Sequence, residues 1–271
     1  MERQAVDKAI QKIIADINEK CVIQNTAIRD SIFGILENAC TVIYFPFENE
    51  TNRGFHIKKI VKNELQDFVY INTAKPIAEQ IFAAAHEFGH IWEVADKVWK
   101  YLSYEGKPSD KEEEDITNWF AAELLMPTEA FRGAFYAHMD ELGIKPGAVK
   151  FDDLVRLIVL QMNDFMVPYE SVRKRLGETK ILKQETADYL LKKESDAINL
   201  VAIFAKDSNT YLEKGTCVKT VSGIRTLIEN VENSENVDDF LLTKIKKEFD
   251  IEHVPNAEEG FEIQIGDYTD G

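Results

Sequence analysis

Apolar residues recur at helical spacing through the first 40 residues of the chain. The apolar positions are Val6, Ala9, Ile10, Ile13, Ile14 and Ile17 between residues 3 and 20, and Ile28, Ile32, Ile35 and Leu36 between 26 and 40. Residues three and four apart lie on one face of an α-helix. The pattern therefore predicts two amphipathic helices at the start of the chain.

A different pattern follows, in which β-branched and aromatic residues dominate three short runs. These runs are CTVIYFPF at 40–47, GFHIKKIV at 54–61 and DFVYINT at 67–73. Polar segments separate them, as is typical of strands joined by turns. We expect three strands, antiparallel in part.

The pattern returns to helical spacing after Pro76, a residue that suits the first turn of a helix. It predicts a helix from Ile77 to about Trp99. Gly106 and Pro108 interrupt the periodicity, and Ser109 or Asp110 can cap the helix that follows. The acidic residues of KEEED (111–115), in its first turns, interact favourably with the helix dipole. This second helix should end near Pro127.

The rest of the chain is mainly helical in pattern. We expect helices at about 128–140, 151–163, 168–176, 184–193, 221–232 and 237–249, a strand at INLVAIFA (198–205), and a short strand or acidic tail at GFEIQIGDYTDG (260–271). The pattern of hydrophobic and polar residues changes near residues 190 to 196, which predicts a domain at 1–190 and a C-terminal extension at 191–271. The mixture of segregated helices and strands predicts an α+β fold.

Composition indicates a globular protein, since 45% of the 271 residues are hydrophobic and 30% are charged. No stretch approaches the roughly 18 uncharged apolar residues of a membrane span, and charges run through the N-terminal segment. We therefore expect a cytoplasmic protein without a membrane partner. Cys21, Cys40 and Cys217 are widely spaced, which favours reduced thiols over disulfides or a metal site.

The formal net charge of −16 disfavours direct binding of nucleic acid, because it repels phosphate. Basic residues nevertheless cluster in one segment, the basic island, which consists of Arg173, Lys174, Arg175, Lys180 and Lys183. A DNA-contacting helix within 165–183 is therefore an alternative hypothesis, but we favour a solvated helix face or a docking site for an acidic partner surface, because the net charge opposes the approach of phosphate.

The segment IFAAAHEFGHIW at 81–92 contains the strongest chemical signal. His86 and His90 are four apart, so on a helix they share one face and can bind one ion. Glu87 projects from the flank of the same turn, where a carboxylate can take a proton from water. The surrounding residues are apolar nearly all round the helix, and unpartnered polar groups there would be costly. The pattern predicts a zinc site with Glu87 as general base.

A catalytic zinc ion needs a third protein ligand, for which two places are available. Asp96 occupies the position of the third ligand in metzincins, but that class requires a glycine where this chain has Glu93 in a continuing helix. The alternative is a carboxylate from the acidic run 112–115 on the next helix. There Glu114 and Asn118 share one face, so a ligand and a polar companion could both approach the metal.

Two blocks of this sequence, AAAHEFGHIW and EDITNWFAAELLMP, resemble the ImmA/IrrE family of zinc metallopeptidases. The family pattern is an H-E-x-x-H helix and then a helix close to E-x-x-A-N-x-F-A-A-x-L-L-M-P, from which this chain departs at Thr117. The resemblance covers roughly 40 to 190 and includes VPYESVRKRLGETKIL at 167–182.

The resemblance implies zinc ligands His86, His90 and Glu114, with Glu87 as base and Asn118 as polar companion. It also implies a small gluzincin-like fold, in which a short twisted sheet packs on the metal-bearing helices. Family members are paired with helix-turn-helix repressors, which they cleave. We therefore expect a zinc endopeptidase that cleaves a specific regulatory protein, with a non-proteolytic zinc-containing regulator as the alternative. We also expect DFVYINT to be the edge strand on which an extended substrate pairs.

Overall fold

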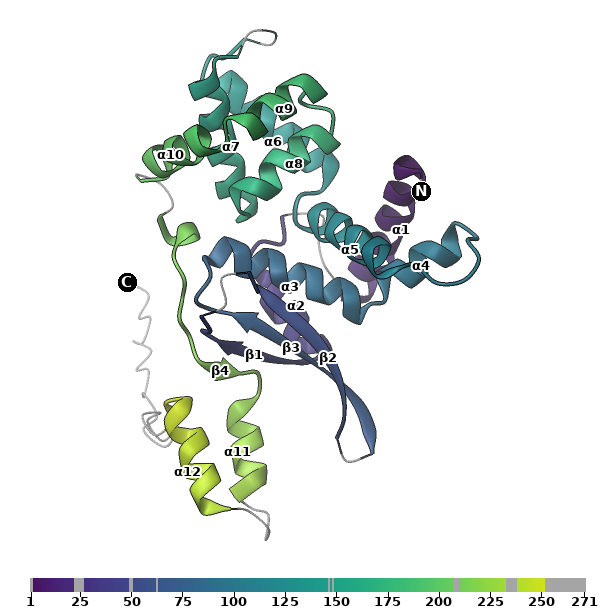
Figure 1. Ribbon diagram of the computed structural model, residues 1–271, viewed down its shortest axis with the longest axis vertical. Coiled ribbons are helices and arrows are strands. Elements are labelled where there is room, and N and C mark those ends of the chain that lie inside the picture. The colour runs from purple at the N-terminus through teal and green to yellow at the C-terminus, as the bar shows by residue number, and fades with distance from the viewer. Residues whose placement is uncertain are drawn as a thin grey trace, which may run out of the picture. The chain divides into compact units, whose positions relative to one another are not determined.

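The computed structural model (Figure 1) describes residues 2–21, 27–48, 51–61, 63–145, 147, 149–206, 210–232 and 238–251. The chain divides into two compact units, Met1–Ser222 and Gly223–Gly271. This division lies C-terminal to the boundary predicted near 190 to 196, because the chain after residue 190 still contributes a helix and a strand to the first unit. The segment GFEIQIGDYTDG lies outside the described residues.

The first unit contains helices and strands in this order: α1 (Arg3–Cys21), α2 (Ser31–Ala39), β1 (Thr41–Phe45), β2 (Gly54–Val61), β3 (Glu64–Asn72), α3 (Ile77–Ile91), α4 (Val94–Tyr101), α5 (Asp110–Leu125), α6 (Thr128–Glu141), α7 (Phe151–Phe165), α8 (Tyr169–Glu178), α9 (Gln184–Lys192), α10 (Glu194–Ala205), the 3-10 helix η1 (Thr210–Glu213) and β4 (Thr220–Val221). The second unit contains α11 (Ile224–Glu232) and α12 (Asp239–Glu248). Within the described ranges, every helix is too short or too polar to span a lipid bilayer.

The strands form one mixed sheet in the order β2-β3-β1-β4, so the predicted α+β class is confirmed. β3 is antiparallel to β2 and parallel to β1, and β4 is antiparallel to β1. The three predicted strands are present. The expectation that DFVYINT is an edge strand is wrong, since β3 is hydrogen-bonded on both sides and β2 forms the edge.

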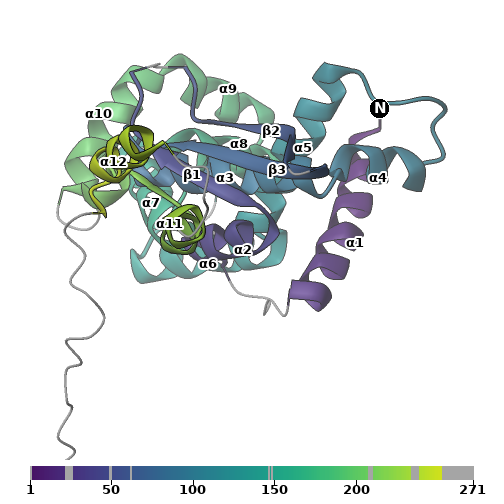
Figure 2. The ribbon, with the colours of Figure 1, turned by 90° about the horizontal axis from the view of Figure 1, so that it is seen from below.

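Helix α3 lies across the sheet and contacts β2 and β3, and α5 packs along α3 (Figure 1). Small residues Ala83, Ala84 and Ala85 are buried in α3, which lets it approach its neighbours closely. Helix α1 packs against α4 and α5, and both views place these three helices together (Figures 1 and 2). Helices α6 to α10 pack on one another in a second group. The sheet and the first group of helices thus hold α3 and α5 side by side.

The prediction of one helix from Ile77 to Trp99 is wrong in one respect, because this segment forms two helices, α3 and α4. The chain turns at Trp92 and Glu93, and Glu93 adopts the left-handed conformation with φ of 50°. That conformation is unfavourable for a residue with a side chain, so the sequence offers no signal for the break.

The predicted strand INLVAIFA is also wrong, since it belongs to helix α10. Ala197, Val201 and Ala205 are spaced four apart and are buried, and α10 packs on α7. A short apolar run is ambiguous between strand and helix, and burial on one helical face decides it here. The fourth strand instead lies at Thr220–Val221, at the start of a segment predicted to be helical.

Arg175 is a buried cation that joins α8 to the junction between α5 and α6. Its Nη2 donates to the carbonyl oxygen of Met126 at 2.9 Å and to Oγ1 of Thr128 at 2.9 Å, and it also pairs with Glu123. These contacts satisfy the carbonyl at the C-terminal cap of α5. Arg175 therefore fastens the helix that carries the acidic run.

Replacing Arg175 with alanine should lower the free energy of unfolding of the first unit by about 3 to 5 kcal/mol, because Glu123 would lose its cationic partner in the interior. The neighbouring variant Lys174→Ala removes only an exposed pair with Glu170 and should cost less than about 1 kcal/mol. Urea denaturation followed by circular dichroism compares the two. Equal losses would contradict a structural role for Arg175.

Candidate metal centre

His86 and His90 lie on one face of α3, as their spacing predicts, and their side chains are largely buried. Nε2 of one ring lies 3.1 Å from Nε2 of the other. Glu87 projects from the same turn and is 6% exposed. The helix therefore presents two imidazole nitrogens and a carboxyl group from a single buried turn.

The approach of α5 to α3 depends on Gly89, which lies between the two histidines. A Cβ at this position would lie 2.8 Å from Cγ2 of Thr117 and 3.0 Å from Cδ1 of Phe120. These distances are shorter than ordinary van der Waals contacts, so only glycine leaves room for α5 here. Thr117, the residue at which the chain departs from the family pattern, fills the space above this glycine.

The acidic run on α5 divides into separate roles. Ser109 caps the helix and exchanges hydrogen bonds with Glu112 in a capping box, as the sequence partly predicts. Glu113 approaches His90, with Oε1 at 3.1 Å from Nδ1. Glu114, one residue further round the helix, faces both histidines.

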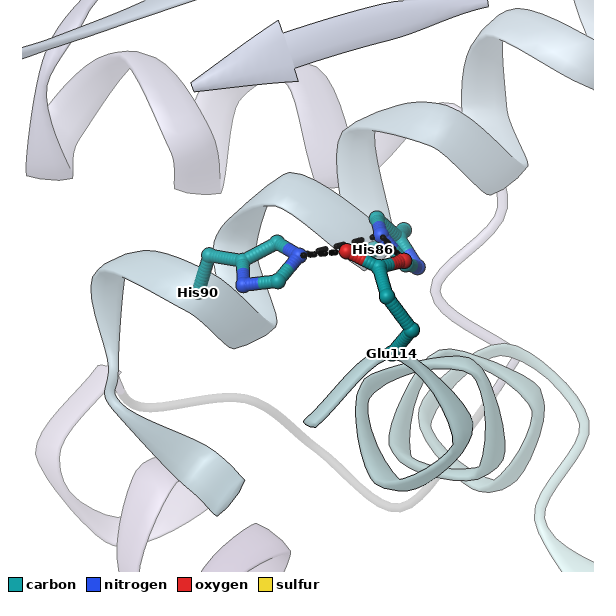
Figure 3. Close-up of side chains that lie close together, drawn as sticks. All are labelled: His86, His90 and Glu114. Carbon is teal, nitrogen blue, oxygen red and sulfur yellow. Dashed lines mark hydrogen bonds and ion pairs between the residues drawn. The ribbon is translucent and has the colours of Figure 1, made fainter. Parts of the chain in front are cut away.

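The side-chain donors of His86, His90 and Glu114 converge (Figure 3). Oε2 of Glu114 lies 3.3 Å from Nε2 of His86, and its Oε1 lies 3.5 Å from Nε2 of His90. Ligands about 2.0 to 2.1 Å from a tetrahedral zinc ion are themselves roughly 3.3 Å apart. The three side chains therefore fit one metal ion, and one coordination position would stay open.

The far nitrogen of each imidazole has its own oxygen partner. Nδ1 of His86 lies 3.1 Å from Oδ1 of Asn118, and Nδ1 of His90 lies 3.1 Å from Oε1 of Glu113. A proton on each Nδ1 would satisfy these oxygens and leave both Nε2 lone pairs available to a cation. Asn118 thus occupies the position predicted for a polar companion, whereas Glu113 was not predicted in this role.

Electrostatics also suit a cation at this point. Burial, reinforced by the neighbouring His86, lowers the pKa of His90, so its ring is neutral at physiological pH. The hydrogen bond to His86 holds the pKa of Glu114 below its usual range, so this carboxylate is ionised. A neutral imidazole at His90 and an ionised carboxylate at Glu114 are the protonation states that a metal requires of these ligands.

Glu87 behaves differently, because burial raises its pKa from 4.5 to about 7. Between these values the folded metal-free protein binds more protons than the unfolded chain, so its stability falls as pH rises from 4.5 through 7. At pH 8 the cost is on the order of 3 kcal/mol. Glu87→Gln should therefore stabilise the metal-free protein by about this amount at pH 8 and by little at pH 4.5.

Chemical denaturation at the two pH values measures this effect, with exposed Glu64 as the control. Glu64→Gln should change the free energy of unfolding by less than about 0.5 kcal/mol. A pH-independent difference for Glu87→Gln would contradict the assigned desolvation.

Asp96, the competing third ligand, lies outside the converging group found among the described residues. The prediction that the helix continues through Glu93 is wrong, since the chain breaks there. The structure nevertheless brings Glu114, not Asp96, to the two histidines.

An open cavity of about 480 Å³ adjoins two of the three side chains, those of His86 and Glu114. Asn118, Phe82, Ala83 and residues 51–54 also line it. Gly54 is the first residue of the edge strand β2. The converging donors are therefore reachable from solvent, next to a strand with a free edge.

Comparison with known proteins gives one family match. The model of Peptidase_M78, described as an IrrE N-terminal-like domain, matches residues 37–177, which is just over half of the chain and includes α3 and α5. No curated protein matches the sequence. A solved chain described as a Mycobacterium tuberculosis transcriptional regulator is similar at a TM-score of 0.41 and 13% sequence identity, over 63% of this chain and 46% of that chain. This chain thus aligns with less than half the length of that structure.

Proposed function

The chain belongs to the Peptidase_M78 family, and from this premise we propose that it is a zinc-dependent endopeptidase that cleaves a specific regulatory protein. The observation that carries the proposal is the convergence of His86, His90 and Glu114 beside the buried carboxyl group of Glu87. A peptidase family accounts for an otherwise costly group of buried polar side chains.

His86, His90 and Glu114 would hold zinc, which supplies Lewis-acid polarisation when it is bound. The chain itself supplies the proton transfers. The Glu87 carboxylate accepts a proton from the water molecule that attacks the scissile carbonyl carbon, and it then donates that proton to the amine nitrogen that leaves. Its raised pKa suits both steps, because a group that titrates near neutral pH can accept and return a proton.

The edge strand β2 is the place where we propose that an extended substrate pairs. One side of β2 is hydrogen-bonded to β3, and no described strand pairs with its other side. Its first residue, Gly54, lines the same cavity as His86 and Glu114. Strand addition satisfies the main chain of a substrate without requiring particular side chains. This placement replaces the predicted pairing at β3.

We propose a cytoplasmic helix-turn-helix repressor as the substrate, so that cleavage would relieve repression. This choice rests on the family resemblance of the sequence. Low general activity would follow, because docking of a whole protein rather than one side-chain pocket would set specificity.

The alternative of a DNA-contacting helix at 165–183 would have to rest on the exposed residues Lys174, Lys180 and Lys183, because the two arginines of the basic island are not available. Arg175 is buried in the contacts already described, and the side chain of Arg173 is 11% exposed beside Glu194. Neither is free to neutralise a phosphate. A non-proteolytic zinc-containing regulator is the alternative that the geometry leaves, since it would use the same ligands.

The proposed activity is tested by incubating the zinc-loaded full chain with candidate repressors and with total protein from the source cells, and then labelling new N-termini. We expect a few defined cleavage sites that disappear after chelation and return with added zinc. If the zinc-loaded protein generates no new termini under any of these conditions, the endopeptidase proposal fails.

A further inference from the structure

Three cavities follow one another from the candidate metal centre toward helix α10. The first, of about 480 Å³, is lined by His86 and Glu114, and it shares Phe82 and Asn118 with a second cavity of about 330 Å³. The second shares Glu79, Pro168 and Glu170 with a third of about 450 Å³. Arg53 lines all three. The three cavities therefore adjoin one another, with Arg53 at both junctions, and we call them together the groove.

The far end of this groove is mainly apolar. Met162, Ile198, Val201 and Leu212 line it, contributed by α7, α10 and η1. Ile198 is 51% exposed, although an isoleucine normally avoids water. Tyr169 also lines this end, is 8% exposed, and its hydroxyl has no hydrogen-bond partner among the described residues. The hydroxyl oxygen itself is buried, so Tyr169 contributes its ring to this wall.

The charged residues around the far end are mostly acidic. They are Glu79, Glu170, Glu194 and Glu213, and Arg53 is the only cation in the described lining. Arg53 is paired with Glu79 and Glu170, Lys174 also pairs with Glu170 at 2.8 Å, and Arg173 lies 4.0 Å from Glu194. The four carboxylates still outnumber these three cations, so the field at this end favours a cationic occupant.

Helix α10 and η1 lie outside residues 37–177, which the family match covers. The apolar end is thus built in part by a segment of the chain that the family match does not cover. Its specificity would belong to this chain in particular.

The geometry points to a substrate-docking groove in which the apolar end receives a hydrophobic side chain of the protein substrate, within a segment that carries lysine or arginine. This inference rests on the proposed peptidase function and assigns it a substrate class. The substrate segment runs from the metal centre past Arg53 and Glu79 to Ile198.

Binding is measured by fluorescence polarisation on the zinc-loaded full chain carrying Glu87→Gln, so that probes are not cleaved. The probes are three fluorescein-labelled peptides of about twelve residues, which span roughly 40 Å when extended. One is built from leucine and lysine, one from leucine and glutamate, and one from serine and lysine. The leucine and lysine peptide should bind at least about tenfold tighter than either of the others.

Variants on α10 locate the binding. Ile198→Ser removes the exposed apolar wall, and Ala202→Trp fills the cavity that it lines; each should weaken binding of the leucine and lysine peptide about tenfold. Ile203→Ser is the matched control, since Ile203 is 60% exposed on the same helix and does not line the cavity. All three change exposed positions, so each should fold.

Equal effects of Ile198→Ser and Ile203→Ser, or equal affinity for the lysine and glutamate peptides, would overturn the docking groove. A co-purifying small apolar molecule seen by native mass spectrometry, and lost in Ala202→Trp, would assign the cavity to that molecule instead. Peptide binding with the expected pattern but no hydrolysis by the wild-type chain would retain the groove and reject the peptidase. If Ile198→Ser hydrolyses the substrate as fast as the wild-type chain, the peptidase is retained and the docking groove is rejected.

Discussion

Replacing Glu87 with glutamine is expected to lower the rate of substrate hydrolysis by about 10²- to 10⁴-fold while zinc stays bound. Glutamine has nearly the same shape but cannot accept a proton from water at neutral pH. Glu87 is not among the three converging ligand atoms, so the donor set for the metal is unchanged. The variant therefore separates proton transfer from metal binding.

The measurement combines zinc content by atomic absorption with cleavage of a substrate mapped by its new termini. Exposed Glu64→Gln, on β3, is the control and should retain full activity. This experiment also decides between the two functions that use the same ligands. A non-proteolytic regulator would keep its biological effect in Glu87→Gln, and such a result would reject the peptidase.

The local part of the site could be predicted from the sequence. A spacing of four residues determines that His86 and His90 share a helical face, and Ser109 marks the start of α5. These features depend on neighbours within one or two turns. The fold class and most helices and strands follow for the same reason, because hydrophobic periodicity is a local signal.

Features that depend on distant parts of the chain were not predictable in this way. The central place of β3 depends on its pairing with β1 and β2 together. The helical state of 198–205 depends on burial against α7, and the break at Glu93 depends on tertiary contacts that outweigh a disfavoured backbone conformation.

The choice among three consecutive glutamates on α5 also depends on distant parts of the chain, since it is decided by the rotation of α5 about its axis. Gly89 allows the close approach of α5, but its role is visible only once Thr117 and Phe120 are seen against it.

The same rotation of α5 gives a prediction that distinguishes Glu113 from Glu114. Glu114→Ala should weaken zinc binding far more than about 100-fold and abolish hydrolysis, because its oxygens face Nε2 of both histidines. Glu113→Ala should weaken zinc binding only about 10- to 100-fold, because it contacts the far nitrogen, Nδ1, of His90. Alanine favours helix at both positions, so α5 itself should be retained.

Competition with a chromophoric zinc chelator measures both affinities on the full-length chain, and circular dichroism checks the helix content of each variant. The two side chains are adjacent, similarly exposed and identical in type, so the comparison isolates the direction in which each one points. A larger loss for Glu113→Ala would mean that α5 is rotated by one residue from the arrangement described. Equal losses would mean that neither carboxylate is the third ligand, and the fit of one metal ion to His86, His90 and Glu114 would have to be abandoned.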